Sequence, residues 1–503
     1  MTASYDTLLR LRAWHQGRAQ VRVSYQQVRV QPHAMLLAPV KMAGEDVTIF
    51  ACGWGGRSGP MRFDFVADPR NRDAEYALFG RLGAVLARYF AWCQAHGLHP
   101  QVWVASPAAV RLLDLLADRL RYAGSGPAAK PAEVVRFGEH LTLLAQRAAV
   151  PGNQTPLAAT EVLGLHYATG QQPAEDAHLG AFLAWIDPPP GQPLEEAVAA
   201  AEATPMGVLA QPDTDNDELA GLVAAWNAAR RRDASPAAPD ALARPVAAVL
   251  RTVVTPIFDA IGAAIDAIER LGLPELASLA GRVAGEERTF AAFMAYLDRP
   301  DHRFALRDQP LPAALGLLER EAAAADLAAE LALEDPLCRA QAASAGAALT
   351  ATLVAHQQTS EPSVGPTGRR SRRQVHTITL ATAEADGRLR PGDTFRSIAN
   401  PGLVVEVRDF TTDPSEGLRI AARVTGGFSR PGVPAVGTVL ELVAAVPERW
   451  RFPQKRTKVR TRLAGGLPWP HDPTQPPPAA SGRPHPDPLA VVERLRAAGG
   501  RPG

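Results

Sequence analysis

The sequence predicts a multidomain α+β protein with four successive regions and a linker. Residues 1–125 have the pattern of a mixed α/β sheet domain, residues 130–350 that of a helical domain, and residues 374–463 that of a small five-stranded β-barrel with a basic C-terminal arm. Residues 351–373 form the expected linker, and residues 464–503 form a Pro-rich tail that we expect to be disordered. Two observations carry this prediction: apolar alternation at both ends of the chain, and Ala- and Leu-rich helical periodicity between them.

In the first region, the order of elements indicates a sheet covered by helices. The run VRVSYQQVRV alternates as a strand does, and the helix over residues 73–96 has Asn71 or Asp73 as its N-cap and Gly97 as its stop. We also expect helices at Tyr5–His15 and Ala108–Tyr122, and strands at Ala34–Lys41, Val47–Cys52, Met61–Val66 and Gln101–Ser106.

The region 130–350 is dense in Ala and Leu, and Pro or Gly interrupts it at loops such as DPPPGQP and ASPAAP, which predicts a set of helices. The runs VHTITLATA, DTFRSI, GLVVEVRDF, LRIAARV and GTVLELVAA follow the polar linker QQTSEPSVGPTGRRSRR. Five short strand-like runs separated by Gly, Pro and Asp predict a barrel of the oligonucleotide-binding or SH3-like kind.

Positive charge is concentrated around the predicted barrel. The chain has a net charge of +1, but residues 1–365 hold 31 basic and 40 acidic residues, whereas residues 366–463 hold 18 basic and 9 acidic residues. The chain contains 49 arginines and only four lysines, so arginine is its default cation, typical of bacteria with GC-rich genomes, and the position of a lysine is more informative. The excess near the barrel predicts a positive local field on a molecule that is nearly neutral overall.

Composition favours a soluble cytoplasmic protein. The three cysteines, Cys52, Cys93 and Cys338, are far apart and form no CxxC pair, which is typical of a reducing compartment. The N-terminus lacks the apolar core of a secretory signal. Charged residues interrupt the most apolar region, Val246–Leu273, so we expect no membrane-spanning helix.

The scarcity of lysine excludes several catalytic motifs. No lysine follows a glycine, which removes the phosphate loop of P-loop enzymes, and none stands two residues after an acidic residue or a histidine, which removes two nuclease motifs. The serine patterns Gly-x-Ser-x-Gly and Ser-x-x-Lys are absent. We therefore predict no catalytic residue, no metal and no cofactor, and we lean toward a protein that is not an enzyme.

Three weaker candidates have structural explanations that we favour. The stretch GWGGRSG (Gly53–Gly59) precedes a predicted strand, which favours a hairpin over an anion-binding loop assisted by Arg57. Cys93, His96 and His99 lack a second pair of ligands for zinc. The acidic residues Asp64, Asp68, Asp73 and Glu75 resemble a nuclease cluster, but Asp73 and Glu75 fit the solvated first turn of a helix. We assign Trp92, Trp103, Trp185 and Trp226 to cores.

The stretch RWRFPQKRTKVRTRL (Arg449–Leu463) is the strongest functional candidate. Its cations at 456, 458, 460 and 462 recur at every second residue, so an extended chain presents them on one face as a row that suits phosphates. Trp450 and Phe452 offer faces on which bases stack. The predicted nucleic-acid-binding residues are Arg369, Arg370, Arg372, Arg373, Arg449, Trp450, Arg451, Phe452, Lys455, Arg456, Lys458, Arg460 and Arg462.

These observations predict a non-catalytic nucleic-acid-binding or accessory protein of a DNA-processing system. The basic arm would bind phosphates with little sequence preference, and the acidic N-terminal body would bind a protein partner. One alternative is a protein-interaction scaffold whose arm docks on an acidic surface, including the body of this chain. Another is an enzyme with a pocket between the first two domains that uses Asp64, Asp68, Glu139 and His140. A membrane partner is disfavoured because no amphipathic helix accompanies the charge.

The run LEDPLCRAQ (Leu333–Gln341), followed by the basic linker and the barrel, resembles the region ahead of the motor in bacterial superfamily 1 helicase–nuclease fusions. The resemblance covers about residues 330–450 and rests on the arrangement of elements. It implies a barrel that sits beside a motor and contacts nucleic acid. The chain lacks the phosphate loop and the nuclease motif of that family, so the resemblance implies an accessory subunit and no catalytic residues.

Overall fold

The computed structural model describes residues 2–45, 47–124, 129–210, 214–232, 237–305, 310–364, 370–383, 389–413, 417–427 and 432–444. The chain divides into two compact units, one of residues 1–306 with 320–447 and one of residues 307–319 with 448–503. The second unit is described only in residues 310–319, which are helical. The predicted tail and the arm from Arg449 lie outside the described residues.

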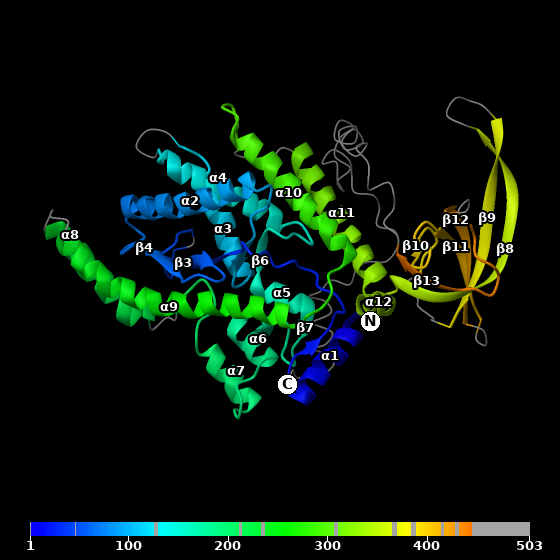
Figure 1. Ribbon diagram of the computed structural model, residues 1–503, viewed down its shortest axis with the longest axis horizontal. Coiled ribbons are helices and arrows are strands. Elements are labelled where there is room, and N and C mark those ends of the chain that lie inside the picture. Colours follow the sequence, from blue (N-terminus) through cyan, green and yellow to red (C-terminus); the bar gives the residue numbers. More distant parts are fainter. Residues whose placement is uncertain are drawn as a thin grey trace, which may run out of the picture. The chain divides into compact units, whose positions relative to one another are not determined.

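A five-stranded sheet forms the centre of the N-terminal region (Figure 1). Its strand order is β4-β3-β2-β5-β6, in which β2, β3 and β4 form an antiparallel meander and β5 and β6 run parallel to β2. This arrangement confirms the mixed sheet and helix that the sequence predicts. The elements are α1 (Thr2–Gln16), β1 (Gln20–Val21), β2 (Met35–Val40), β3 (Ala51–Gly56), β4 (Arg62–Phe65), α2 (Arg72–Ala95), β5 (Val102–Val104), α3 (Pro107–Leu120), α4 (Ala132–Ala148) and β6 (Pro156–Ala158).

Glycines in β3 let a long helix approach one face of this sheet. A Cβ atom at Gly53 would stand 2.6 Å from Val254 Cγ1, and one at Gly55 would stand 3.3 Å from the Phe258 ring. Val254 and Phe258 belong to α9 (Ala237–Arg270), so β3 turns its glycines toward that helix. Because side chains alternate along a strand, Trp54 points to the opposite face.

The region 159–344 is mostly helical, as the sequence predicts, and α9 is its longest helix. One stretch of α9, Ala243–Arg270, is long and apolar enough by length and composition to cross a membrane. Val254, Ile261 and Ile265 of this stretch are buried in the same core as the sheet, which accounts for its apolar character. The other elements are α5 (Ala159–His166), β7 (Tyr167–Ala168, paired with β1), η2 (Glu175–Ala177), α6 (Leu179–Ile186), α7 (Leu194–Glu202), η3 (Thr214–Leu219), α8 (Ala220–Arg232), α10 (Ala277–Leu297), α11 (Pro310–Glu334) and α12 (Pro336–Ser344).

The run VRVSYQQVRV was expected to be a strand, and this expectation is wrong beyond Val21. Isolated backbone contacts, such as Gln26 with Pro274 and Leu276, and distant side chains together take the place of a neighbouring strand here. The backbone N–H of Ser24 donates to Asp335 (2.8 Å) and that of Arg29 donates to the Gln154 amide (3.0 Å). The Gln101 amide likewise accepts from the N–H of Gln31 (2.9 Å). Alternation in the sequence indicates an extended chain. It does not indicate a strand here, because the hydrogen-bond partners of this segment come from distant residues.

The C-terminal region is a closed barrel of six strands in the order β10-β11-β12-β9-β8-β13. The barrel is confirmed, but the expected count of five strands is wrong, because β8 arises from residues that we expected to be a linker. Its polar half, from Gln357, pairs through its backbone with β9 in a long hairpin that ends with Val364 opposite Arg370 (Figure 1). The strands are β8 (Ala348–Val364), β9 (Arg370–Thr382), β10 (Thr394–Ser397), β11 (Val404–Asp413), β12 (Gly417–Gly426) and β13 (Val439–Ala444).

Candidate nucleic-acid interface

Most residues of the predicted basic interface lie outside the described residues. This holds for Arg369, Arg449, Trp450, Arg451, Phe452, Lys455, Arg456, Lys458, Arg460 and Arg462. The remaining three, Arg370, Arg372 and Arg373, lie at the start of β9, in the part of the hairpin farthest from the β9–β12 pairing. The structure thus brings these three together on one strand.

Two arginines of the barrel strands are paired with carboxylates of the chain, and a third donates to a serine. Arg372 donates from Nε to the Ser360 hydroxyl and from Nη2 to the Ser360 carbonyl, both at 3.0 Å. Arg423 lies 3.7 Å from a carboxylate oxygen of Glu361, and Arg408 lies 3.1 Å from one of Glu406. These pairs reduce the charge that the barrel offers to a ligand. The expected alternative, in which the basic arm docks on the acidic body of the chain, concerns residues outside the described part.

Further cations without a carboxylate partner in the described part of the chain occur beside the N-terminal sheet. A cavity of about 380 Å³ lies against Trp54 of β3. We call it the aromatic–arginine groove, and its lining is His33, Ala34, Met35, Trp54, Gly55, Gly56, Gly59, Pro60, Arg62, Val85, Arg88 and Tyr89. Arg62 and Arg88 are exposed, and among the described residues neither has a carboxylate within ion-pair distance. Two free guanidinium groups therefore border a groove that holds aromatic rings.

The floor of the groove is fixed by a network around Trp54. Arg62 lies opposite Trp54 in the β3–β4 register, and its guanidinium carbon is 5.2 Å from the centroid of the indole ring. The indole N–H donates to Asp64 at 3.0 Å, and the other carboxylate oxygen of Asp64 accepts from Arg81 at 3.0 Å. Both oxygens of Asp64 are thus occupied, and Arg62 keeps its charge beside an aromatic face.

Helix α2 extends this surface away from the groove. Arg81, Val85, Arg88, Trp92 and His96 recur at intervals of three and four residues, so they lie on one face of the helix, which we call the α2 stripe. Trp92 is 43% exposed, and its ring stacks on that of His96 with centroids 4.3 Å apart. The ring of His33 lies 5.4 Å from Trp92. The groove and the α2 stripe therefore form one surface of cations and aromatic rings.

The hairpin interpretation of GWGGRSG is confirmed, because β3 and β4 pair antiparallel on either side of it. Arg57 does not serve this groove: it pairs with Asp266 at 2.9 Å and with Glu269, both on α9. A phosphate would have to compete with two carboxylates for this guanidinium.

Cys93, His96 and His99 do not converge. Cys93 is fully buried, and burial raises the pKa of its thiol to about 12, so it stays protonated. His96 is exposed, and its ring nitrogen lies 2.7 Å from the Trp92 carbonyl. The His99 ring is buried 3.3 Å from the Gln154 carbonyl, and its pKa is lowered by burial. In the part of the chain that the structure describes, no three metal-binding side chains gather.

The acidic candidates are also held by separate partners. Asp68 accepts from Asn227 at 2.7 Å, and Glu139 accepts from His302 at 2.8 Å. Glu75, which we expected at a solvated helix start, is 2% exposed and binds Arg119 and Thr48. That expectation is wrong because the first turn of α2 faces α3. His140 is buried against Phe90, and burial lowers its pKa to about 4.

The groove escaped prediction because its parts are distant in sequence. Trp92 was assigned to a core, and this assignment is wrong, whereas Trp103, Trp185 and Trp226 are buried as expected. One signal in the sequence could have indicated this surface: the spacing of Arg81, Arg88 and Trp92 places them on one face of α2. No family model, no curated protein and no solved structure matches this chain, so the assignment of a function rests on the geometry alone.

Proposed function

We propose that this protein is a non-catalytic nucleic-acid-binding or accessory protein that holds a single strand on the aromatic–arginine groove and the α2 stripe. Arg62 and Arg88 bind phosphates, and the indole rings of Trp54 and Trp92 stack with bases. The observation that carries this proposal is that two exposed guanidinium groups, without carboxylate partners in the described part of the chain, line the same groove as Trp54.

A single strand suits this surface better than a duplex. Stacking on Trp54 requires a base whose face is accessible, and the bases of a duplex have their faces covered by their neighbours. Affinity would come from phosphate charge and stacking, with little sequence preference. The arginines at the start of β9 and the predicted arm from Arg449 are the proposed second contact.

The test is the binding of fluorescein-labelled oligothymidylate to the full chain, followed by fluorescence anisotropy over a range of salt concentrations. We expect affinity to fall steeply with salt, and the double variant R62A/R88A to bind at least about tenfold more weakly at low salt. Its log–log salt dependence should be shallower by about 1.4, because two phosphate contacts at about 0.7 each are lost.

The matched control is R70A, which removes an exposed arginine whose charge is already paired with Glu45 at 3.0 Å. We expect R70A to bind as the unaltered protein does. Binding by R62A/R88A with unchanged affinity and salt dependence would refute the groove as the interface. Failure of the unaltered protein to bind any oligonucleotide would favour the scaffold alternative, in which a pull-down partner persists after nuclease treatment.

A further inference from the structure

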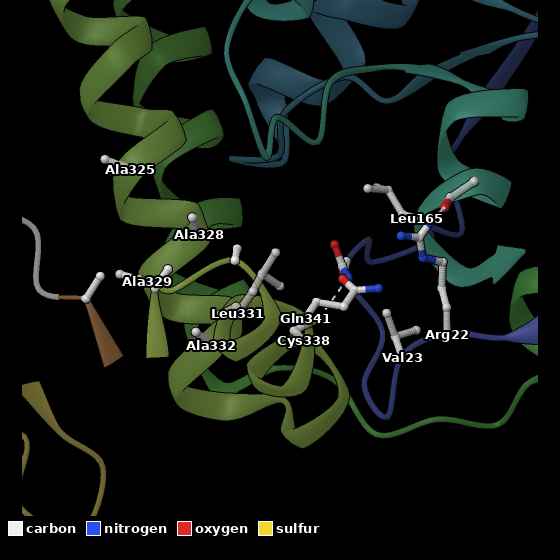
Figure 2. A pocket seen from close by; sticks show the side chains of 16 residues that line it. Arg22, Val23, Leu165, Ala325, Ala328, Ala329, Leu331, Ala332, Cys338 and Gln341 are labelled. Atoms are coloured by element: carbon white, nitrogen blue, oxygen red, sulfur yellow. Dashed lines mark hydrogen bonds between the residues drawn. The ribbon is translucent and has the colours of Figure 1, made fainter. Parts of the chain in front are cut away.

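A second cavity, of about 560 Å³, lies among the extended segment after β1, the end of α5, and the helices α11 and α12 (Figure 2). Eight of its sixteen lining residues are alanines, and four of these, Ala325, Ala328, Ala329 and Ala332, come from α11. An alanine fills no space beyond its Cβ atom, so the helix leaves an open apolar wall. The volume lies within the range of small-molecule sites.

The polar groups of this cavity gather on the side away from α11. Figure 2 shows the α11 alanines on one side, and Arg22 with Leu165 on the other, with Gln341 between them. Arg22 donates to the Gly164 carbonyl at 3.1 Å and lies 3.3 Å from Asp6. The contact with Gly164 commits one of its five N–H groups, and the others donate no hydrogen bond within the described residues, since Asp6 Oδ1 receives none.

Gln341 supplies an independent sign that a ligand atom belongs here. Its Nε2 atom is shielded from solvent and has no hydrogen-bond partner in the described part of the chain. An amide group left buried and unpaired costs about 1–3 kcal/mol, so the arrangement favours an occupant that accepts a hydrogen bond. The Cys338 thiol beside it is a poor partner, because burial raises its pKa to about 12 and keeps it protonated.

The walls are held in place by a buried N-cap. Asp335 is fully buried at the start of α12, where Oδ1 accepts from the Leu337 N–H at 2.8 Å. The other oxygen, Oδ2, accepts from the Ser24 N–H at 2.8 Å. One carboxylate therefore fixes α12, which carries Gln341, against the extended segment that carries Arg22. The donors that face the cavity are preorganised before any ligand binds.

We propose that this cavity binds a small aliphatic carboxylic acid. Its hydrocarbon chain lies along the alanines of α11, and its carboxylate accepts hydrogen bonds from Gln341 and Arg22. A cation such as an alkylammonium offers no acceptor to the unpaired Gln341 N–H groups and is repelled by the guanidinium of Arg22. The proposal is independent of nucleic-acid binding, since it uses other residues.

The test titrates the full chain with decanoic acid and, separately, with decylamine, below the concentration at which either self-associates, and follows heat release. We expect decanoate to bind with one site and decylamine at least about tenfold more weakly. Non-specific electrostatic attraction predicts the opposite order of affinities, because residues 1–365 carry more acidic than basic residues and attract the amine.

Three variants locate the site. A329L and A342L fill the cavity and should abolish decanoate binding, whereas A324L, which places the same side chain at an exposed position of α11, should leave it unchanged. Q341L removes the unpaired donor and should weaken decanoate about tenfold without affecting decylamine. Thermal unfolding confirms that each variant is folded. Equal affinity for the two ligands, no binding of decanoate, or unchanged binding by A329L and A342L would each overturn the proposal.

Discussion

The barrel and the N-terminal sheet differ in the partners that the fold gives to their arginines. Residues 366–463 hold an excess of basic residues, yet Arg408 pairs with Glu406 on the same strand β11, and Arg423 of β12 pairs with Glu361 of β8. Residues 1–125 hold 15 basic and 9 acidic residues, and Arg62 and Arg88 among them are exposed, with no carboxylate partner in the described part of the chain. A count of charges along the chain sums both kinds and does not distinguish them. The positions of nearby carboxylates, which the fold decides, determine which cations remain free for a polyanion.

The largest expected effect concerns the attachment of α2, which carries half of the proposed surface. Glu75 is buried and accepts hydrogen bonds from Arg119 at 2.5 Å and from Thr48 at 2.6 Å. We expect E75A to lower the free energy of unfolding by about 3 kcal/mol, because Arg119 and Thr48 lose their partner in a partly buried site. Chemical denaturation followed by tryptophan fluorescence measures this loss.

E45A is a suitable comparison for Glu75, since Glu45 pairs with Arg70 at the surface and should contribute little to stability. Residues 348–444 contain no tryptophan, so the fluorescence of the chain does not report on the barrel. If E75A and E45A unfold at the same denaturant concentration, the buried pair does not anchor α2.

Acid should destabilise the N-terminal region through His140. Burial lowers the pKa of His140 to about 4, whereas the unfolded side chain titrates near 6.5. Between these values only the unfolded state binds the proton, so stability is complete above pH 6.5 and declines as the pH falls toward 4. We expect this residue alone to account for a loss of about 2 kcal/mol between pH 8 and pH 5.

The variant H140L should make the pH dependence of unfolding shallower, because leucine suits the apolar surroundings of Phe90 and does not titrate. H15L, at an exposed position of α1, should leave the dependence unchanged. His99 and His166 are also buried, with a pKa lowered by burial, so some dependence remains in H140L. A pH profile of H140L that matches the unaltered protein would contradict this assignment.

Trp54 should contribute more to nucleic-acid binding than Trp92. Trp54 lines the groove beside Arg62, whereas Trp92 lies farther along α2 and outside the groove. We expect W54A to weaken binding of oligothymidylate about tenfold, since stacking contributes about 1–3 kcal/mol per base, and W92A to weaken it a few-fold. W54F keeps an aromatic face and should recover most of the affinity. Anisotropy titrations, with thermal unfolding as a check on folding, separate these cases, and equal binding by W54A and the unaltered protein would exclude stacking there.

The sequence predicts elements wherever local chemistry determines them. The side chain of Asn71 accepts from the Ala74 N–H as the N-cap of α2, and the glycines of GWGGRSG form the predicted hairpin. Strand β8 was missed because its second half is polar and is specified by its pairing with β9. The groove was missed for a related reason: Trp54, Arg62 and Arg88 meet only after β3, β4 and α2 pack together. Sites made by tertiary packing leave little trace in local patterns.

The smallest expected effect is the one that tests the comparison between the two regions most directly. R408A/R423A removes two arginines from the barrel, the same change in charge as R62A/R88A makes at the groove. Both Arg408 and Arg423 already interact with a carboxylate of the chain. We therefore expect the affinity for oligothymidylate to change less than about twofold and the salt dependence of binding to stay the same. The same anisotropy titration measures both pairs. R408A/R423A could instead weaken binding as much as R62A/R88A does. In that case a polyanion displaces Glu406 and Glu361 from their arginines, and pairing within the chain does not determine which cations are available.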